Sequence, residues 1–147
     1  MMSAKGVRMR IRGRYKMRIL VVEDTVLKYV DICRNIKRCC DAEFTQAKTL
    51  DEAKRIIEEM PNDRPFDLFV TDMYYPLKAG GEDSESGFKF IGLVNERGLE
   101  IPIIICSTIK YRAEDMKNVI GSVQYNKRVD IGQEFEELIK KVKEDER

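Results

Sequence analysis

Five polar residues of this chain could together form a divalent-metal site with a nucleophilic carboxylate. They are the adjacent pair Glu23 and Asp24, then Asp72, Ser107 and Lys127. Each follows or ends a short apolar run of the kind that forms a buried strand. If these strands are parallel neighbours, their carboxyl ends bring the five side chains to one edge of a sheet. Three clustered carboxylates repel one another unless a cation lies among them, which predicts the metal.

The elements that must position these residues alternate regularly from residue 17 onward. Apolar, β-branched runs predict strands, and apolar residues at helical spacing predict helices. This alternation favours a single domain with a parallel sheet that is covered on both faces. The predicted strands are residues 18–22, 42–47, 66–71, 103–106 and 123–126. The predicted helices are residues 25–37, a segment that opens at Thr49 and is ended by Pro61, and residues 87–96, 113–120 and 133–144.

Composition excludes several kinds of chemistry. The 147 residues include no histidine, which removes His-based acid–base catalysis, Ser-His-Asp hydrolysis and most zinc sites. The four cysteines have no metal-type spacing and are predicted to be reduced thiols. No apolar run approaches the length of a membrane span, and the amino terminus lacks a signal-peptide core. We therefore expect a cytoplasmic protein without a membrane partner.

The basic charge is concentrated at the amino terminus. The first 18 residues hold seven basic residues and no acidic one, although the chain has a net charge of only +1. Residues 1–16 are therefore expected to form an arm outside the domain of residues 17–147. The arm could be a disordered or non-native extension, or an added edge strand. Binding to nucleic acid is the weaker alternative, and we do not expect it.

On these residues the chain resembles the receiver domains of two-component response regulators, the family of the chemotaxis response regulator. The resemblance covers about residues 17–145. That family has an acidic pair after its first strand, a phosphoacceptor aspartate after the third, a Ser or Thr ending the fourth and a lysine ending the fifth. The resemblance implies a flavodoxin-like, doubly wound (βα)5 fold whose five parallel strands have the order 2-1-3-4-5. The matching residues are Glu23, Asp24, Asp72, Ser107 and Lys127.

The resemblance also implies a function. Asp72 would accept a phosphoryl group from the phosphohistidine of a sensor histidine kinase or phosphotransfer protein, or from a small phosphodonor. Lys127 and Ser107 would contact that group. Mg²⁺ would be the cofactor, and its ligands would be Glu23, Asp24, Asp72 and the backbone carbonyl of Tyr74.

The phosphoryl group would then act as a switch in phosphorelay signal transduction. Ile109, Tyr111 and the predicted helix of residues 113–120 would reorganise and change the binding of an unknown downstream protein. The protein would be a single-domain signalling module, not an enzyme with a separate substrate. A homodimer is left open.

Three features depart from the family pattern. Gln124 stands where the family has a switch aromatic residue, and strand alternation predicts that Tyr125 faces the opposite side. Arg128 replaces the proline that usually follows Lys127, which removes the usual reason for a cis peptide. The polar, Gly-rich segment of residues 76–86 is long for such a connection. It is interpreted as a flexible surface loop, with a partner-specific lid as the alternative.

Two other functions compete with the phosphoacceptor hypothesis. A pseudo-receiver would keep the fold and bind partners without being phosphorylated, and the two departures around Lys127 favour it. A haloacid-dehalogenase-like phosphatase also uses an aspartate nucleophile. That family needs a second aspartate two residues after the first, where this chain has Tyr74, so we do not favour it.

Overall fold

A computed structural model of the chain describes residues 16–126, 128 and 130–145. The predicted basic arm of residues 1–16 therefore lies outside the described residues, apart from Lys16. Lys127 also lies outside them, and with it the peptide bond to Arg128, whose isomer the sequence leaves open.

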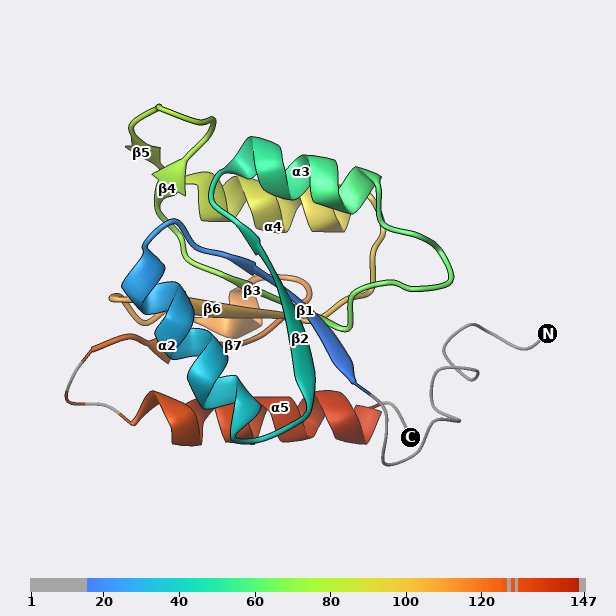
Figure 1. Cartoon of the computed structure of the whole chain (residues 1–147), viewed down its shortest axis with the longest axis vertical. Helices are drawn as coiled ribbons and strands as arrows, with labels where there is room; N and C mark the ends of the chain where they lie inside the picture. The colour runs from blue at the N-terminus through green and yellow to red at the C-terminus, as the bar shows by residue number, and fades with distance from the viewer. Residues whose placement is uncertain (1–15, 127, 129, 146–147) are drawn as a thin grey trace.

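Five parallel strands form the central sheet (Figure 1). They lie in the order β2-β1-β3-β6-β7, and every neighbouring pair is parallel. This confirms the flavodoxin-like order 2-1-3-4-5. The central strands β1, β3 and β6 are almost entirely buried because helices cover both faces of the sheet. The five strands are β1 (Met17–Val22), β2 (Ala42–Ala47), β3 (Leu68–Thr71), β6 (Ile103–Ser107) and β7 (Val119–Gln124).

Two pairs of helices cover the two faces of the sheet (Figure 1). On one face lie α2 (Val26–Lys37) and α5 (Ile131–Asp145), and on the other α3 (Leu50–Glu58) and α4 (Ser86–Glu96). Each helix turns an apolar stripe to the sheet, and most of its charged residues face solvent, with Lys28 of α2 as a buried exception. None of the helices in the described part of the chain is both long and apolar enough to cross a membrane.

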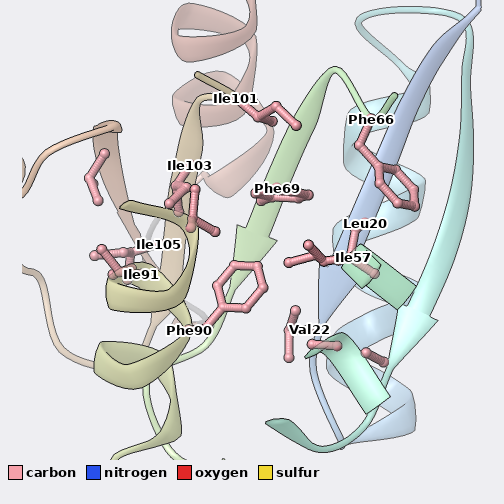
Figure 2. Close-up of a cluster of buried hydrophobic side chains, with 14 of the residues drawn as sticks. Leu20, Val22, Ile57, Phe66, Phe69, Phe90, Ile91, Ile101, Ile103 and Ile105 are labelled. Atoms are coloured by element: carbon pink, nitrogen blue, oxygen red, sulfur yellow. The ribbon is translucent and has the colours of Figure 1, made fainter. Parts of the chain in front are cut away.

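The core under α3 and α4 is built around aromatic rings (Figure 2). Phe69 of β3 is fully buried, and its ring centroid lies 5.3 Å from that of Phe90 in an edge-on arrangement. The Phe66 ring lies 6.0 Å from Phe69 on the other side. Such edge-on pairs stabilise the fold beyond the burial of their surface. This packing fixes β3, and Asp72 directly after it, relative to α4.

The prediction of a helix at residues 113–120 is wrong. The structure has only a short 3-10 helix, η1 (Ala113–Asp115), and β7 begins four residues before the predicted strand of residues 123–126. Asn118 has a φ of 73°, a left-handed conformation that interrupts an α-helix. Its side-chain amide donates a hydrogen bond to the Leu99 carbonyl at 2.7 Å, which holds this turn in place. Four helices are therefore described instead of the five that were predicted.

The segment after Asp72, which was interpreted as a flexible surface loop, has secondary structure of its own. It contains a two-stranded antiparallel ladder formed by β4 (Tyr75–Pro76) and β5 (Asp83–Ser84). The hydroxyl of Ser86, at the start of α4, donates a hydrogen bond to the carbonyl of Tyr75. The Tyr75 side chain itself is fully buried. Both contacts tie the hairpin to the body of the protein.

Gly87 allows α4 to start against the backbone that carries Asp72. Its N–H donates a hydrogen bond to the Met73 carbonyl at 3.1 Å. A Cβ atom added here would clash with the Asp72 carbonyl oxygen and would lie 2.5 Å from the Met73 Cα. Because both neighbours are backbone atoms, they cannot move aside as a flexible side chain would.

We expect Gly87→Ala to destabilise the protein by about 1–3 kcal/mol or more, because the added methyl group overpacks this contact. The measurement is the free energy of unfolding from urea titration. Gly92→Ala in the same helix is the matched control, since no atom lies within 4 Å of its added Cβ. The control should be neutral or stabilising by about 0.5–1 kcal/mol. Equal effects of the two substitutions would contradict the close approach at Gly87.

Candidate functional site

The acidic residues after β1 and β3 lie side by side at the carboxyl edge of the sheet. Val22 pairs with Thr71 in the ladder between these strands, so the next residues, Glu23 and Asp72, are also neighbours. Glu23 is almost fully buried, with 1% of its surface exposed. The Asp72 side chain is 17% exposed and so can be reached from solvent. Asp24 is half-buried.

A buried lysine that the sequence analysis missed lies between two of these acids. Lys28 is in the first turn of α2 and is only 7% exposed. Its Nζ lies 2.9 Å from Glu23 Oε1 and 3.1 Å from Asp72 Oδ2. One signal in the sequence could have drawn attention to it. The first turn of α2 holds this lysine and no acidic residue, which is opposite to the preference of a helix amino terminus.

The pKa values reflect burial and crowding of charge. Burial raises the pKa of Glu23, although Lys28 acts in the opposite direction. Burial, together with the charges of Asp83 and Asp72, raises the pKa of Asp24. Burial alone would lower the pKa of Lys28, but the charges of Glu23 and Asp72 outweigh it and raise that pKa. Lys28 therefore stays protonated, and its one charge does not balance three carboxylates.

The hairpin after Asp72 adds a further acid to this edge. Asp83 begins β5, and its charge is the largest carboxylate effect on the pKa of Asp24. Asp83 could not be assigned to the site from the sequence, because an acid in a polar segment far along the chain gives no signal of proximity. The hairpin therefore increases the negative charge around Asp24.

Hydrogen bonds fix the backbone and side chain of Asp72. The Met73 N–H donates to Asp72 Oδ1 at 2.6 Å, while Oδ2 faces Lys28. The Thr71 hydroxyl donates to the Asp72 carbonyl at 2.7 Å and lies 3.1 Å from the hydroxyl of Tyr75. Both carboxylate oxygens therefore have defined positions before any ligand binds.

Ser107 ends β6 at the same edge of the sheet. It is 2% exposed, and its hydroxyl accepts a long hydrogen bond of 3.4 Å from the Ile109 N–H. The Ser107 carbonyl accepts a hydrogen bond of 2.7 Å from the Tyr125 N–H. Gln124 donates from its side chain to the Thr108 carbonyl at 3.2 Å and so joins the end of β7 to the loop after β6.

Tyr125 points to the α2 side, as strand alternation predicted. Its ring centroid lies 5.4 Å from Lys28 Nζ, and its hydroxyl donates to Asp31 Oδ2 at 2.9 Å. The ring therefore packs against the same ammonium group that pairs with Asp72. Arg128, farther along, donates its N–H to the side chain of Asn126 at 2.7 Å. Lys127, the remaining predicted site residue, lies outside the described residues.

The predicted magnesium ligands are of the chemical type that Mg²⁺ binds, but the ammonium group of Lys28 already pairs with two of them. Carboxylate and carbonyl oxygens are the donors that Mg²⁺ prefers, and repulsion among Asp24, Asp72 and Asp83 is what a cation would relieve. Within the described residues, however, no three acidic, cysteine or histidine side chains converge as a ready metal site. The ammonium of Lys28 takes up the charge of Glu23 and Asp72 instead.

Comparison with models of protein families gives no match, and no curated protein sequence matches the chain. Solved structures do match. The receiver domain of the Francisella response regulator 1452 is 16% identical, with a TM-score of 0.65, over 88% of this chain and 99% of that one. The response regulatory domain of mrkE from Klebsiella pneumoniae is 12% identical, with a TM-score of 0.68, over 88% and 98%.

A third similar structure was solved with a metal and a beryllium fluoride. It is the response regulator TrrA from Thermotoga maritima in complex with Mg(2+)-BeF, which is 20% identical, with a TM-score of 0.64, over 86% of this chain and 98% of that one. The sequence identities are low, while each match covers most of both chains. The chain therefore has the fold of response-regulator receiver domains.

Proposed function

We propose that this chain is a response-regulator receiver that accepts a phosphoryl group on Asp72. One observation carries the proposal most strongly. The Asp72 carboxylate is accessible to solvent at the carboxyl edge of the sheet, with Oδ1 held by an amide and Oδ2 by an ammonium group. The donor would be the phosphohistidine of a sensor kinase or phosphotransfer protein, or a small phosphodonor. The protein would act in signalling and not on a separate substrate.

In the reaction, an Asp72 oxygen attacks phosphorus while the bond to the leaving group breaks. With a phosphohistidine the imidazole nitrogen leaves, and with acetyl phosphate acetate leaves. The product is an acyl phosphate on Asp72. The chain contributes chiefly orientation and charge, as in other phosphoryl transfers. The Met73 N–H orients the carboxylate, and Lys28 partly offsets the negative charge of the incoming group.

The other predicted residues have proposed roles beside Asp72. Mg²⁺, when bound by Asp24, Asp72 and the Tyr74 carbonyl, with Glu23 direct or through water, would neutralise phosphoryl oxygens. The Ser107 hydroxyl, which accepts a long hydrogen bond from the Ile109 N–H, would donate to another phosphoryl oxygen. Lys127 would pair with Asp72 before transfer and with the phosphoryl group afterwards.

The switch would act through the loop after β6, since the expected helix of residues 113–120 is absent. Ile109 is 54% exposed in this loop. The Tyr111 N–H is held by the Ser122 hydroxyl at 2.9 Å, and the Tyr111 ring packs edge-on against Phe88 at 5.8 Å. We propose that phosphorylation draws Ser107 toward Asp72 and shifts this loop, which changes the binding of a downstream protein.

A phosphorylation-independent pseudo-receiver is the second candidate. It is favoured by Gln124, whose hydrogen bond to the Thr108 carbonyl takes the place of a mobile aromatic residue. The short η1 in place of a full helix also departs from the expected switch region. Direct measurement of phosphorylation separates the two candidates.

We expect incubation with acetyl phosphate and Mg²⁺ to add the mass of one phosphoryl group to the intact protein. Asp72→Asn should abolish the adduct, because an amide is not a nucleophile of this kind. Asp51→Asn is the control, since Asp51 is an exposed acid at the start of α3. The measurement is intact-mass spectrometry. Absence of any adduct on the wild-type chain would refute the phosphoacceptor function and leave the pseudo-receiver.

We also expect Ser107→Ala to slow phosphorylation of Asp72 by about tenfold or more, because a hydrogen bond to a charged oxygen is lost. Ser107→Thr should keep most of the rate, since it keeps the hydroxyl. The rate is followed by intact mass over time, and circular dichroism checks that both variants fold. A wild-type rate for Ser107→Ala would show that this hydroxyl does not contact the phosphoryl group.

A further inference from the structure

We propose that Lys28 is an internal cation that competes with a divalent metal ion for the acidic pocket, so that metal binding requires Lys28 to give up Glu23 and Asp72. The inference deepens the proposed function and rests on it, because it concerns the carboxylates that would take the phosphoryl group. It assigns a role to a residue that neither the spacing of the acids nor the resemblance to receivers indicates.

The ammonium group of Lys28 already pairs with carboxylate oxygens that a metal ion would need as ligands. Lys28 Nζ lies within 3.1 Å of Asp72 Oδ2 and 2.9 Å of Glu23 Oε1. The other Asp72 oxygen already accepts the Met73 N–H at 2.6 Å. A metal ion that binds Asp72 must therefore share an oxygen with an existing partner. Sharing with the ammonium brings two cations together, which raises the free energy of the bound state.

The surroundings of Lys28 hold its ammonium group in this position. The side chain is buried, and the Tyr125 ring lies 5.4 Å from Nζ. The charge of Lys28 also acts on the thiol of Cys106, whose pKa burial raises to about 12. If Lys28 leaves this environment for water, Glu23 stays buried without its cation. That vacancy is what a divalent ion would fill.

The uncompensated acids explain why a metal would enter at all. Lys28 pairs with Glu23 and Asp72, while Asp24 stays half-exposed and is crowded by Asp83. A divalent ion brings two charges to a pocket where the lysine supplies one. The binding of the metal ion and the ion pairing of Lys28 are thus negatively coupled, so that each weakens the other.

A purely structural ion pair is the competing explanation. In that case Lys28 only anchors α2 to the sheet, and its removal lowers stability without changing the affinity for metal. Competition predicts instead that removing the charge of Lys28 raises the affinity of the protein for Mg²⁺. The two explanations therefore differ in a quantity that can be measured without any phosphorylation.

The first experiment measures Mg²⁺ binding by isothermal titration calorimetry on the full chain. We expect Lys28→Met to bind Mg²⁺ about tenfold more tightly than wild type, or more, because the competing charge is gone while the carboxylates remain. Lys37→Met is the matched control. It carries the same substitution at the other end of α2, where the lysine is exposed and its Nζ lies 6.0 Å from the Phe44 ring. Its affinity should equal that of wild type.

The second experiment uses the wild-type chain, in case Lys28→Met does not fold. Lysine acetylation by an activated ester is followed site by site by mass spectrometry, with and without Mg²⁺. Displacement predicts that acetylation of Lys28 becomes faster as Mg²⁺ is added, while that of Lys37 does not. A folded Lys28→Met variant that binds Mg²⁺ no more tightly than wild type would overturn the inference. If that variant is unfolded, an unchanged Lys28 rate up to the highest Mg²⁺ concentration would overturn it.

These results are independent of the test of phosphorylation. Tighter metal binding by Lys28→Met, without a phosphoryl adduct on the wild type, would support the competition and refute the phosphoacceptor function. A phosphoryl adduct on Asp72 of the wild type, with unchanged Mg²⁺ affinity in Lys28→Met, would support the phosphoacceptor function and refute the competition.

Discussion

The paired salt bridges from Lys28 to Glu23 and Asp72 are the interaction on which the site depends. Each of these groups is costly to bury alone, since the desolvation of an ion amounts to several kcal/mol and is offset only by close partners. Glu23 can be buried because Lys28 is there, and Lys28 can be buried because two carboxylates face it. The three residues come from β1, α2 and the end of β3, so the pairing also holds these elements together.

The sheet makes this pairing possible by aligning strand ends. Parallel pairing in register puts the residues after β1 and β3 next to each other, whatever their chemistry. The apolar packing of Phe69 and the close approach of Gly87 then fix where the backbone of Asp72 lies. Charge and packing thus act on the same few atoms. A displacement of the Asp72 backbone would change both Lys28 pairing and the start of α4.

The parts of this arrangement that could be predicted are those with a local signal. Strands β1, β3 and β6 are apolar and β-branched, so they, and the acids after β1 and β3, could be placed from the sequence. Lys28 could not, because a lysine in a helix is usually exposed and its burial depends on contacts with distant strands. The missing helix at residues 113–120 has a similar origin. There the pairing of β7 with β6 and the left-handed Asn118 override a helix-compatible pattern.

The end of β7 connects the two sides of the site. Gln124 and Tyr125 are adjacent, so the pleat sends their side chains to opposite faces. Gln124 holds the loop after β6 through Thr108, whereas Tyr125 packs on Lys28 and bonds Asp31 of α2. If Asp72 is phosphorylated as we propose, the change of charge would act on Lys28 directly and on the loop through Ser107. Both effects would therefore meet in two consecutive residues at the end of β7, so that the α2 side and the loop would respond together.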